Sequence, residues 1–161
     1  KVMDARKFEE TKDLTMQDFQ NIVNKIADLT EYRASPLFKH HKSKEELTEI
    51  LLNMWFNGEL EVYRDTTTHK LAGVLSCSIT ELWWIEGDVL IENLLVSLES
   101  APNGFGAFAI DVMEEIAYRN NCVLICSGSS MIQDSTLIQN MYKKHGFTVY
   151  GESYLKEVEQ H

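Results

Sequence analysis

The stretch that decides the fold is an apolar segment, Val89-Leu-Ile-Glu-Asn-Leu-Leu-Val96, followed after a short connection by Gly104-Phe105-Gly106. The apolar segment predicts a buried strand, and the two glycines predict the turn at which a helix begins. The first turn of a helix leaves its backbone N–H groups without intrahelical partners, and glycines add no side chain to cover them. Because these groups and the helix dipole point at one place, we expect the turn to attract a phosphate group.

The length of 161 residues fits a single domain, residues 1–161, with a full core. No apolar run approaches the ~20 residues that a membrane span needs, and the first residues lack a signal-peptide core, so we expect no membrane partner. Cys122 and Cys126 flank one apolar strand, where ~3.3 Å per residue holds them roughly 13 Å apart and excludes a disulfide between them. With Cys77 they indicate a reducing, cytoplasmic setting.

The charge is strongly acidic, with 15 Lys and Arg against 25 Asp and Glu and a net charge of −10. Nucleic-acid binding relies on a basic surface, so we expect no nucleic-acid partner. An acidic surface favours cationic partners such as amines, polyamines or basic peptides. The alternative is that the acidity only keeps the protein in solution.

The expected helices and strands fall into two segments of the chain. Residues 1–58 are expected to hold a strand over Lys7–Thr11, a helix capped by Thr15 and a second helix opened by the capping box Ser43-Lys-Glu-Glu46. Residues 59–161 form the expected sheet and core, with strands over 59–65, 70–85, 89–96, 122–126 and 147–158 and helices after Gly106 and after Asp134 or Ser135. The continuous apolar run at 122–126 favours a central strand covered on both faces. The predicted fold class is α/β, a mixed central sheet of six or seven strands with about four helices.

The turn carries a recognisable spacing. Counting five positions from Val96 places Ala101, Gly104 and Gly106 in the three slots of the pattern Gln/Arg-x-x-Gly-x-Gly/Ala. Downstream, Tyr142 followed by Gly146-Phe147 matches the pattern Tyr-x-x-x-Gly-Phe. Both patterns belong to the GNAT acetyltransferase superfamily, which the chain resembles from about residue 59 to residue 154.

This resemblance implies acyl transfer from acetyl-CoA to a primary amine by direct attack. It implies that the cofactor lies between the strand ending at Val96 and the strand beginning at Cys122, with its diphosphate on the amides of residues 103–107. A backbone N–H near the end of the first strand is implied to bind the thioester oxygen. The implied cofactor-binding residues are Leu95, Val96, Ala101, Asn103, Gly104, Phe105, Gly106, Ala107, Ser135 and Tyr142.

Two residues are candidates for proton transfer. Tyr142 matches the family's proton donor to the departing thiolate; the alternative is a packing aromatic. Glu92 is the candidate general base, because a carboxylate in an apolar strand is buried and its pKa rises toward neutrality. Alternation predicts that it shares a face with Leu90, Leu94 and Val96. The alternative for Glu92 is a charge that reaches solvent or pairs with a lysine.

Other features are expected to matter less. His40 and His41 are adjacent and point apart on any regular element, and no Cys or carboxylate stands at ligand spacing, so we predict no metal site. Trp83-Trp84 is read as one core and one rim residue, with the acceptor pocket as an alternative for one of them. The loop over Arg33–Lys44 is expected to shape the acceptor side.

The first functional hypothesis is a cytoplasmic N-acetyltransferase that uses acetyl-CoA and a cationic small amine or basic peptide, with a homodimer left open. Ala101 replaces the usual Gln or Arg, Pro102 has no N–H to offer, and Ser135 replaces a frequent Asn. These departures motivate a second hypothesis, a non-catalytic GNAT-fold module for binding or assembly. A nucleotide-binding domain is disfavoured, because Gly104-x-Gly106 lacks a third glycine and no Gly-Lys-Ser/Thr occurs.

Overall fold

The computed structural model describes residues 7–31, 40, 42–99, 103–128, 136–151, 154 and 156–160. The predictions for Ala101, Pro102, Asp134 and Ser135 therefore lie outside the described residues. In chain order the elements are β1 (Phe8–Glu10), α1 (Met16–Glu31), α3 (Lys44–Phe56), β2 (Glu61–Asp65), β3 (Leu71–Glu81), β4 (Asp88–Ser97), α4 (Phe105–Arg119), β5 (Leu124–Cys126) and α5 (Thr136–Lys144).

Both N-terminal helices begin at their predicted caps. Thr15 Oγ1 accepts a hydrogen bond from the Asp18 N–H at 3.1 Å, and Asp18 Oδ2 accepts one from the Thr15 N–H at 2.9 Å. Ser43 and Glu46 form the expected capping box, with Ser43 Oγ 3.2 Å from the Glu46 N–H nitrogen. Each pair satisfies N–H groups that the first helical turn would otherwise leave open.

The described strands form one sheet in the order β1-β2-β3-β4-β5, antiparallel except for the parallel pair of β4 and β5. The α/β class is confirmed, but the described residues form five strands, not six or seven. Within 147–158, the described residues are not in a strand. Apolar side chains there, including Val149 and Tyr154, are exposed, so they bury no surface that would hold a strand against β5.

The prediction of a central, doubly covered strand at 122–126 is also wrong for the described sheet. β5 pairs with β4 on one side and is the last strand in the order. Val123 and Leu124 are 54% and 46% exposed, so the apolar run lies in the edge strand of the described sheet and not in its centre.

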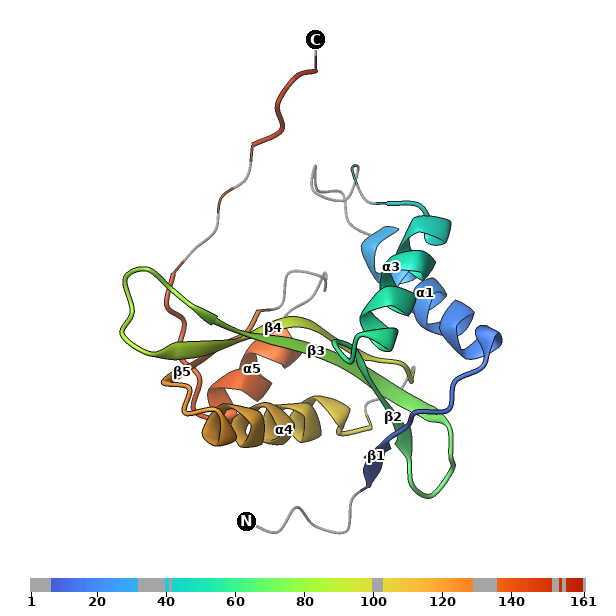
Figure 1. Cartoon of the computed structure of the whole chain (residues 1–161), viewed down its shortest axis with the longest axis horizontal. Coiled ribbons are helices and arrows are strands. Elements are labelled where there is room, and N and C mark those ends of the chain that lie inside the picture. The colour runs from blue at the N-terminus through green and yellow to red at the C-terminus, as the bar shows by residue number, and fades with distance from the viewer. Residues whose placement is uncertain are drawn as a thin grey trace.

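The sheet separates two pairs of helices: α1 and α3 cover one face, and α4 and α5 cover the other (Figure 1). Each face has its own core. The core under α1 and α3 contains apolar residues of both helices, Leu60 and residues of β2, β3 and β4: Ile22, Val23, Ile26, Leu51, Leu60, Val62, Val74 and Val96. The core under α4 contains Phe8, Tyr63, Ala72, Leu75, Leu90, Phe105, Ala109, Ile110 and Met113, with Met141 and Tyr142 of α5 packed beside it.

Candidate active site

β4 contains a bulge in its middle. The register with β3 pairs Ser76 with Leu94 and then Cys77 with Glu92, so that Asn93 has no partner of its own on β3. A bulge of this kind places one extra residue on one strand and changes the alternation of its side chains. Asn93 instead donates through its side-chain amide to Ser78 Oγ at 3.1 Å.

The bulge places Glu92 and Leu94 on opposite faces of the sheet. Cys77, the partner of Glu92, packs against the core under α4, as Leu90 does, whereas Leu94 and Val96 pack under α1 and α3. Glu92 therefore lies on the α4 and α5 face, because cross-strand partners share a face. The prediction that it shares a face with Leu90 is confirmed, and the prediction that it shares one with Leu94 and Val96 is wrong.

The pairing of β4 with β5 stops early. Only three pairs of residues are in register, from Val89 with Leu124 to Ile91 with Cys126. Beyond this point the rest of β4 has no paired strand on its β5 side among the described residues. Unpaired backbone N–H and C=O groups on a strand are a ready edge for an extended ligand. This is the place where the resemblance implies that the cofactor lies.

A cavity of about 620 Å³ lies at the end of this gap. It is bounded by the end of β4, the start of α4, one side of α5 and part of α1. Seven of the predicted cofactor residues line it: Leu95, Val96, Asn103, Gly104, Phe105, Gly106 and Ala107. The structure thus brings together these residues of β4 and the glycine turn.

The glycine turn presents two open N–H groups to this cavity. Gly104 caps α4 in the left-handed region, at a φ of 82°, and has no side chain to fill the helix start. The Phe105 N–H is already taken, because it donates to Asn103 Oδ1 at 3.0 Å. No described residue accepts a hydrogen bond from the N–H of Gly106 or Ala107. The N–H groups left for an anion are therefore those of Gly106 and Ala107, which are fewer than the amides of residues 103–107 that the resemblance implied.

Three cationic or titratable side chains that the sequence reading missed also line the cavity. Lys25 comes from α1, and Lys144 and His145 come from the end of α5. Positive charge beside open helix N–H groups is what a diphosphate needs. The basic residues at 143–145 could have indicated that α5 contributes positive charge to the site. Nothing in the sequence around Lys25 links that residue to the glycine turn.

The two predicted catalytic residues contact each other beside the point where β4 and β5 stop pairing. Tyr142 of α5 donates its hydroxyl hydrogen to Glu92 Oε1 at 2.5 Å, and its oxygen lies 3.4 Å from the Gly128 carbonyl oxygen. Among the described residues, Glu92 thus contacts no lysine and is not free in solvent. The Tyr142 ring packs beside Phe147 and its hydroxyl has a partner in Glu92, an arrangement that both the proton donor and the packing aromatic with a chance partner allow. Ser127 lies nearby, but its buried hydroxyl makes no hydrogen bond of normal geometry to any described residue.

Burial sets the protonation of this pair. Burial raises the pKa of Glu92, while the hydrogen bonds from Tyr142 and from the Gly128 backbone act to lower it. The pKa of Tyr142 is raised by burial first and by the Glu92 charge next. Burial also raises the pKa of the Cys77 thiol, opposite Glu92, to about 12. At neutral pH the phenol and the thiol are therefore both protonated.

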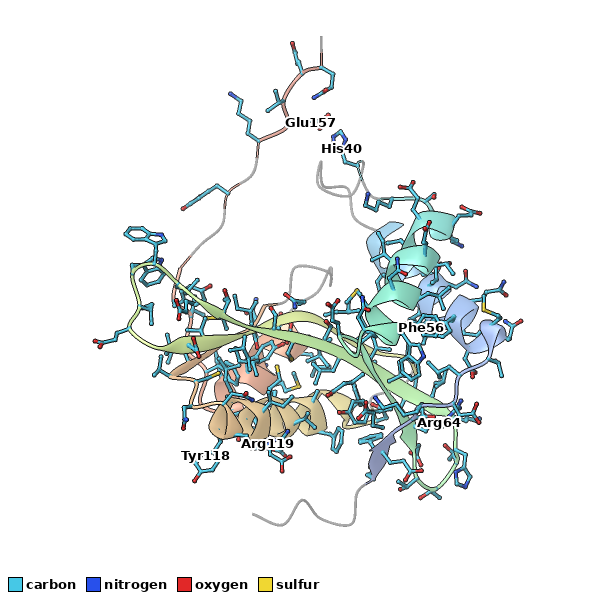
Figure 2. The ribbon with its side chains drawn as sticks, viewed as in Figure 1. His40, Phe56, Arg64, Tyr118, Arg119 and Glu157 are labelled. Carbon is cyan, nitrogen blue, oxygen red and sulfur yellow. The ribbon has the colours of Figure 1, made fainter. Side chains whose placement is uncertain are left out.

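The remaining predicted features lie elsewhere. Trp83 and Trp84 are 96% and 57% exposed in the turn between β3 and β4, because β3 ends at Glu81, so the reading of one of them as a core residue is wrong. His40 Nε2 lies 3.8 Å from Glu157 Oε1 (Figure 2). His41 and most of the Arg33–Lys44 loop lie outside the described residues.

The described part of the chain contains no helix that is long and apolar enough to cross a membrane. It also contains no cluster of three His, Cys, Asp or Glu side chains that could hold a metal ion.

The chain is similar in fold to several solved acetyltransferases. An acetyltransferase from Trypanosoma brucei has a TM-score of 0.61 at 19% identity, over 94% of this chain and 98% of that one. A "predicted acetyltransferase with acetyl-CoA" from Clostridium acetobutylicum has a TM-score of 0.59 at 16% identity, over 93% and 94%. A ribosomal-protein-alanine N-acetyltransferase from Brucella melitensis biovar Abortus has a TM-score of 0.62 at 12% identity, over 94% and 99%.

No protein-family model and no curated protein matches the sequence. At 12–19% identity the structural likenesses define the fold alone. The chain therefore has the fold of these acetyltransferases, as the resemblance to the GNAT superfamily implied.

Proposed function

We propose that the protein transfers the acetyl group of acetyl-CoA to a primary amine of a small molecule or a basic peptide. The observation that carries this proposal is the hydrogen-bonded pair of Glu92 and Tyr142, which lies where β4 and β5 stop pairing. A base and an acid at one strand gap are the two proton-handling groups that amide formation from a thioester requires.

The cavity fits acetyl-CoA in size and in chemistry. A volume of about 620 Å³ lies within the usual range for ligand pockets. The N–H groups of Gly106 and Ala107 would hold the diphosphate, with Lys25 and Lys144 supplying positive charge. The free edge of β4 at Leu95 and Val96 would pair with the amide-containing arm. When bound, acetyl-CoA supplies an activated thioester.

The residues of the chain then have distinct roles. Glu92 takes the proton that the amine nitrogen loses, and its raised pKa suits a base that works near neutral pH. Tyr142 keeps its proton at neutral pH and can give it to the sulfur. An N–H near Leu95 or Val96 would stabilise the charge on the thioester oxygen. The net charge of −10 favours a cationic acceptor.

Binding and turnover should be measured separately. We expect calorimetry to show CoA binding in the micromolar range and thiol release to follow acetyl-CoA in the presence of an acceptor amine. A panel of aliphatic diamines, aromatic amines and lysine-rich peptides would identify the acceptor class. The Tyr142→Phe variant should bind CoA as the wild type does and turn over more slowly.

The outcomes distinguish the proposal from its rival. Absence of heat at millimolar CoA would leave a GNAT-fold module for binding or assembly, as Ala101 and Pro102 suggest from the sequence. CoA binding without turnover on any amine of the panel would support a catalytically inactive cofactor-binding module.

A further inference from the structure

We propose that Glu92 and Tyr142 act as one proton relay, in which the proton taken from the acceptor amine reaches the departing sulfur through the Tyr142 hydroxyl. This inference rests on the acetyl transfer proposed above. It differs from a mechanism in which the base and the acid each exchange their protons with water.

The geometry that points to a relay begins with the bulge at Asn93. In a strand that alternated regularly through Asn93, Glu92 and Leu94 would share one face. With the bulge, Leu94 packs under α1 and α3 while Glu92 lies on the face that α5 covers, and its Oε1 accepts the Tyr142 hydroxyl hydrogen directly. The bulge thus couples two groups that are 50 residues apart in the chain.

The surroundings favour transfer within the pair. The groups that face Glu92 are Tyr142 from α5, Cys77 from β3, and the Gly128 backbone and Ser127 hydroxyl after β5, and the charge of Glu61 on β2 acts on the Cys77 thiol. None of these is a cation. The Tyr142 oxygen lies 2.5 Å from Glu92 Oε1 and can accept a proton from it, and the Ser127 hydroxyl is a second oxygen nearby.

The proton transfers balance. Glu92 takes a proton from the amine nitrogen as that nitrogen forms its bond to the acetyl carbon. Tyr142 gives its hydroxyl proton to the sulfur, which keeps the electron pair of the broken carbon–sulfur bond. Glu92 then returns its proton to the Tyr142 oxygen, after rotation of the carboxyl group. The amine has lost one proton, the thiol has gained one, and both residues end in their initial states.

The order of pKa values allows this return step. Burial and the Glu92 charge both raise the pKa of Tyr142, so a Tyr142 phenolate is a much stronger base than the Glu92 carboxylate. Burial raises the pKa of Glu92 as well, but an ordinary glutamate carboxyl starts about six units below an ordinary phenol. Transfer from a protonated Glu92 to the phenolate is therefore downhill.

The same face of the sheet offers a matched control. Tyr63 donates its hydroxyl hydrogen to Glu61 Oε2 at 2.7 Å, both on β2, and burial raises the pKa of Glu61 as it does that of Glu92. This second pair lies two strands away from the gap between β4 and β5. The Tyr63–Glu61 pair therefore has the same chemical groups as the proposed relay but does not lie at the gap between β4 and β5.

The first test uses the free protein and needs no turnover. Carbon-13 NMR of labelled glutamate side chains follows the titration of Glu92 in the wild type and in Tyr142→Phe. We expect the Glu92 midpoint to move upward in this variant, because a hydrogen bond to the charged form is lost. Tyr63→Phe should move the Glu61 midpoint and leave that of Glu92 in place. An unmoved Glu92 midpoint in Tyr142→Phe would overturn the relay.

The second test is a double-mutant cycle on turnover. Loss of one member of a relay disables the whole path, so Glu92→Gln and Tyr142→Phe should each slow turnover by about 10²–10⁴-fold, and the double variant should be no slower than the slower single variant. Tyr63→Phe should leave turnover unchanged. If the fold-reductions of the two single variants multiplied in the double variant, Glu92 and Tyr142 would act independently. That result would overturn the relay but not the acetyl transfer. Absence of turnover in the wild type on every amine would overturn the acetyl transfer and the relay with it.

Discussion

Gly73 of β3 lies against the ring of Phe105, so close that a Cβ on Gly73 would stand 2.1 Å from Phe105 Cδ2. Phe105 is the first residue of α4 and is almost fully buried. Its ring also contacts Phe8 and Tyr63 at centroid distances of 5.6 Å. This contact fixes where α4 begins, and with it the direction of the open N–H groups of the glycine turn.

We expect Gly73→Ala to destabilise the protein, because the new methyl group has no space beside a ring that is packed on its other sides. Overpacking of a core costs about 1–3 kcal/mol, so the free energy of unfolding in urea should fall by that amount. Gly151→Ala is the control, since no atom lies within 4 Å of its Cβ position. Combining Gly73→Ala with Phe105→Leu should restore part of the loss; unchanged stability of Gly73→Ala would contradict the contact.

Gly106→Ala tests the glycine turn itself. Its Cβ would stand 2.5 Å from Met141 Sδ, and that side chain is flexible, so we expect a small loss of stability and a displaced helix start. Loss of one hydrogen bond to a charged phosphate costs ~1.5–3 kcal/mol, so the Kd for CoA should rise about tenfold or more. Calorimetry measures the Kd, with Gly151→Ala as the control. An unchanged Kd would place the diphosphate elsewhere.

Two neighbouring lysines on α5 allow a charge effect specific to the cavity to be distinguished from the effect of the helix's overall charge. Lys144 lines the cavity at the glycine turn, whereas Lys143 lines a second hollow, which Tyr142 and residues 147–151 also line. We expect Lys144→Ala to weaken CoA binding about two- to fivefold, as an exposed ion pair would, and the effect to shrink at high salt. Lys143→Ala should bind CoA as the wild type does. Equal losses in both variants would indicate a non-specific charge effect.

The sequence predicts the parts of this fold that local chemistry controls. Ser43 and Glu46 cap α3 through neighbouring backbone groups, so four residues suffice to place the helix start. The glycine turn was found in the same way. The bulge at Asn93 was not, because its position depends on which β3 residues lie opposite β4.

In the candidate site too, some residues could be predicted from local sequence and others depend on tertiary packing. The motif spacing selected Tyr142, and the position of a carboxylate in an apolar strand selected Glu92. The structure joins the two directly. Lys25 reaches the cavity only because α1 packs over the sheet, a tertiary fact that no local pattern carries. The apolar alternation at 147–158 predicted a strand, yet a strand also needs a partner edge to bury against, and pattern alone does not supply one.

The two buried carboxylates predict how stability depends on pH. Burial raises the pKa of Glu92 above its value in the unfolded chain, so the folded protein binds this proton more tightly. The resulting stabilisation is complete below the unfolded pKa and is lost as the pH rises through the raised folded pKa. Glu92→Gln cannot ionise, so its free energy of unfolding should fall less than that of the wild type across this window. Glu61→Gln should behave in the same way, since burial raises the pKa of Glu61 too.

Urea unfolding of each variant and the wild type, at steps between pH 4 and pH 7 that bracket the ordinary glutamate range, gives the difference. Glu114→Gln, which removes an exposed carboxylate from α4, controls for the loss of one negative charge. If the Glu92→Gln curve ran parallel to that of the wild type, Glu92 would have the same proton affinity in the folded and unfolded chains. The carboxylate would then be solvated in the gap between β4 and β5, and its hydrogen bond to Tyr142 would not persist in solution.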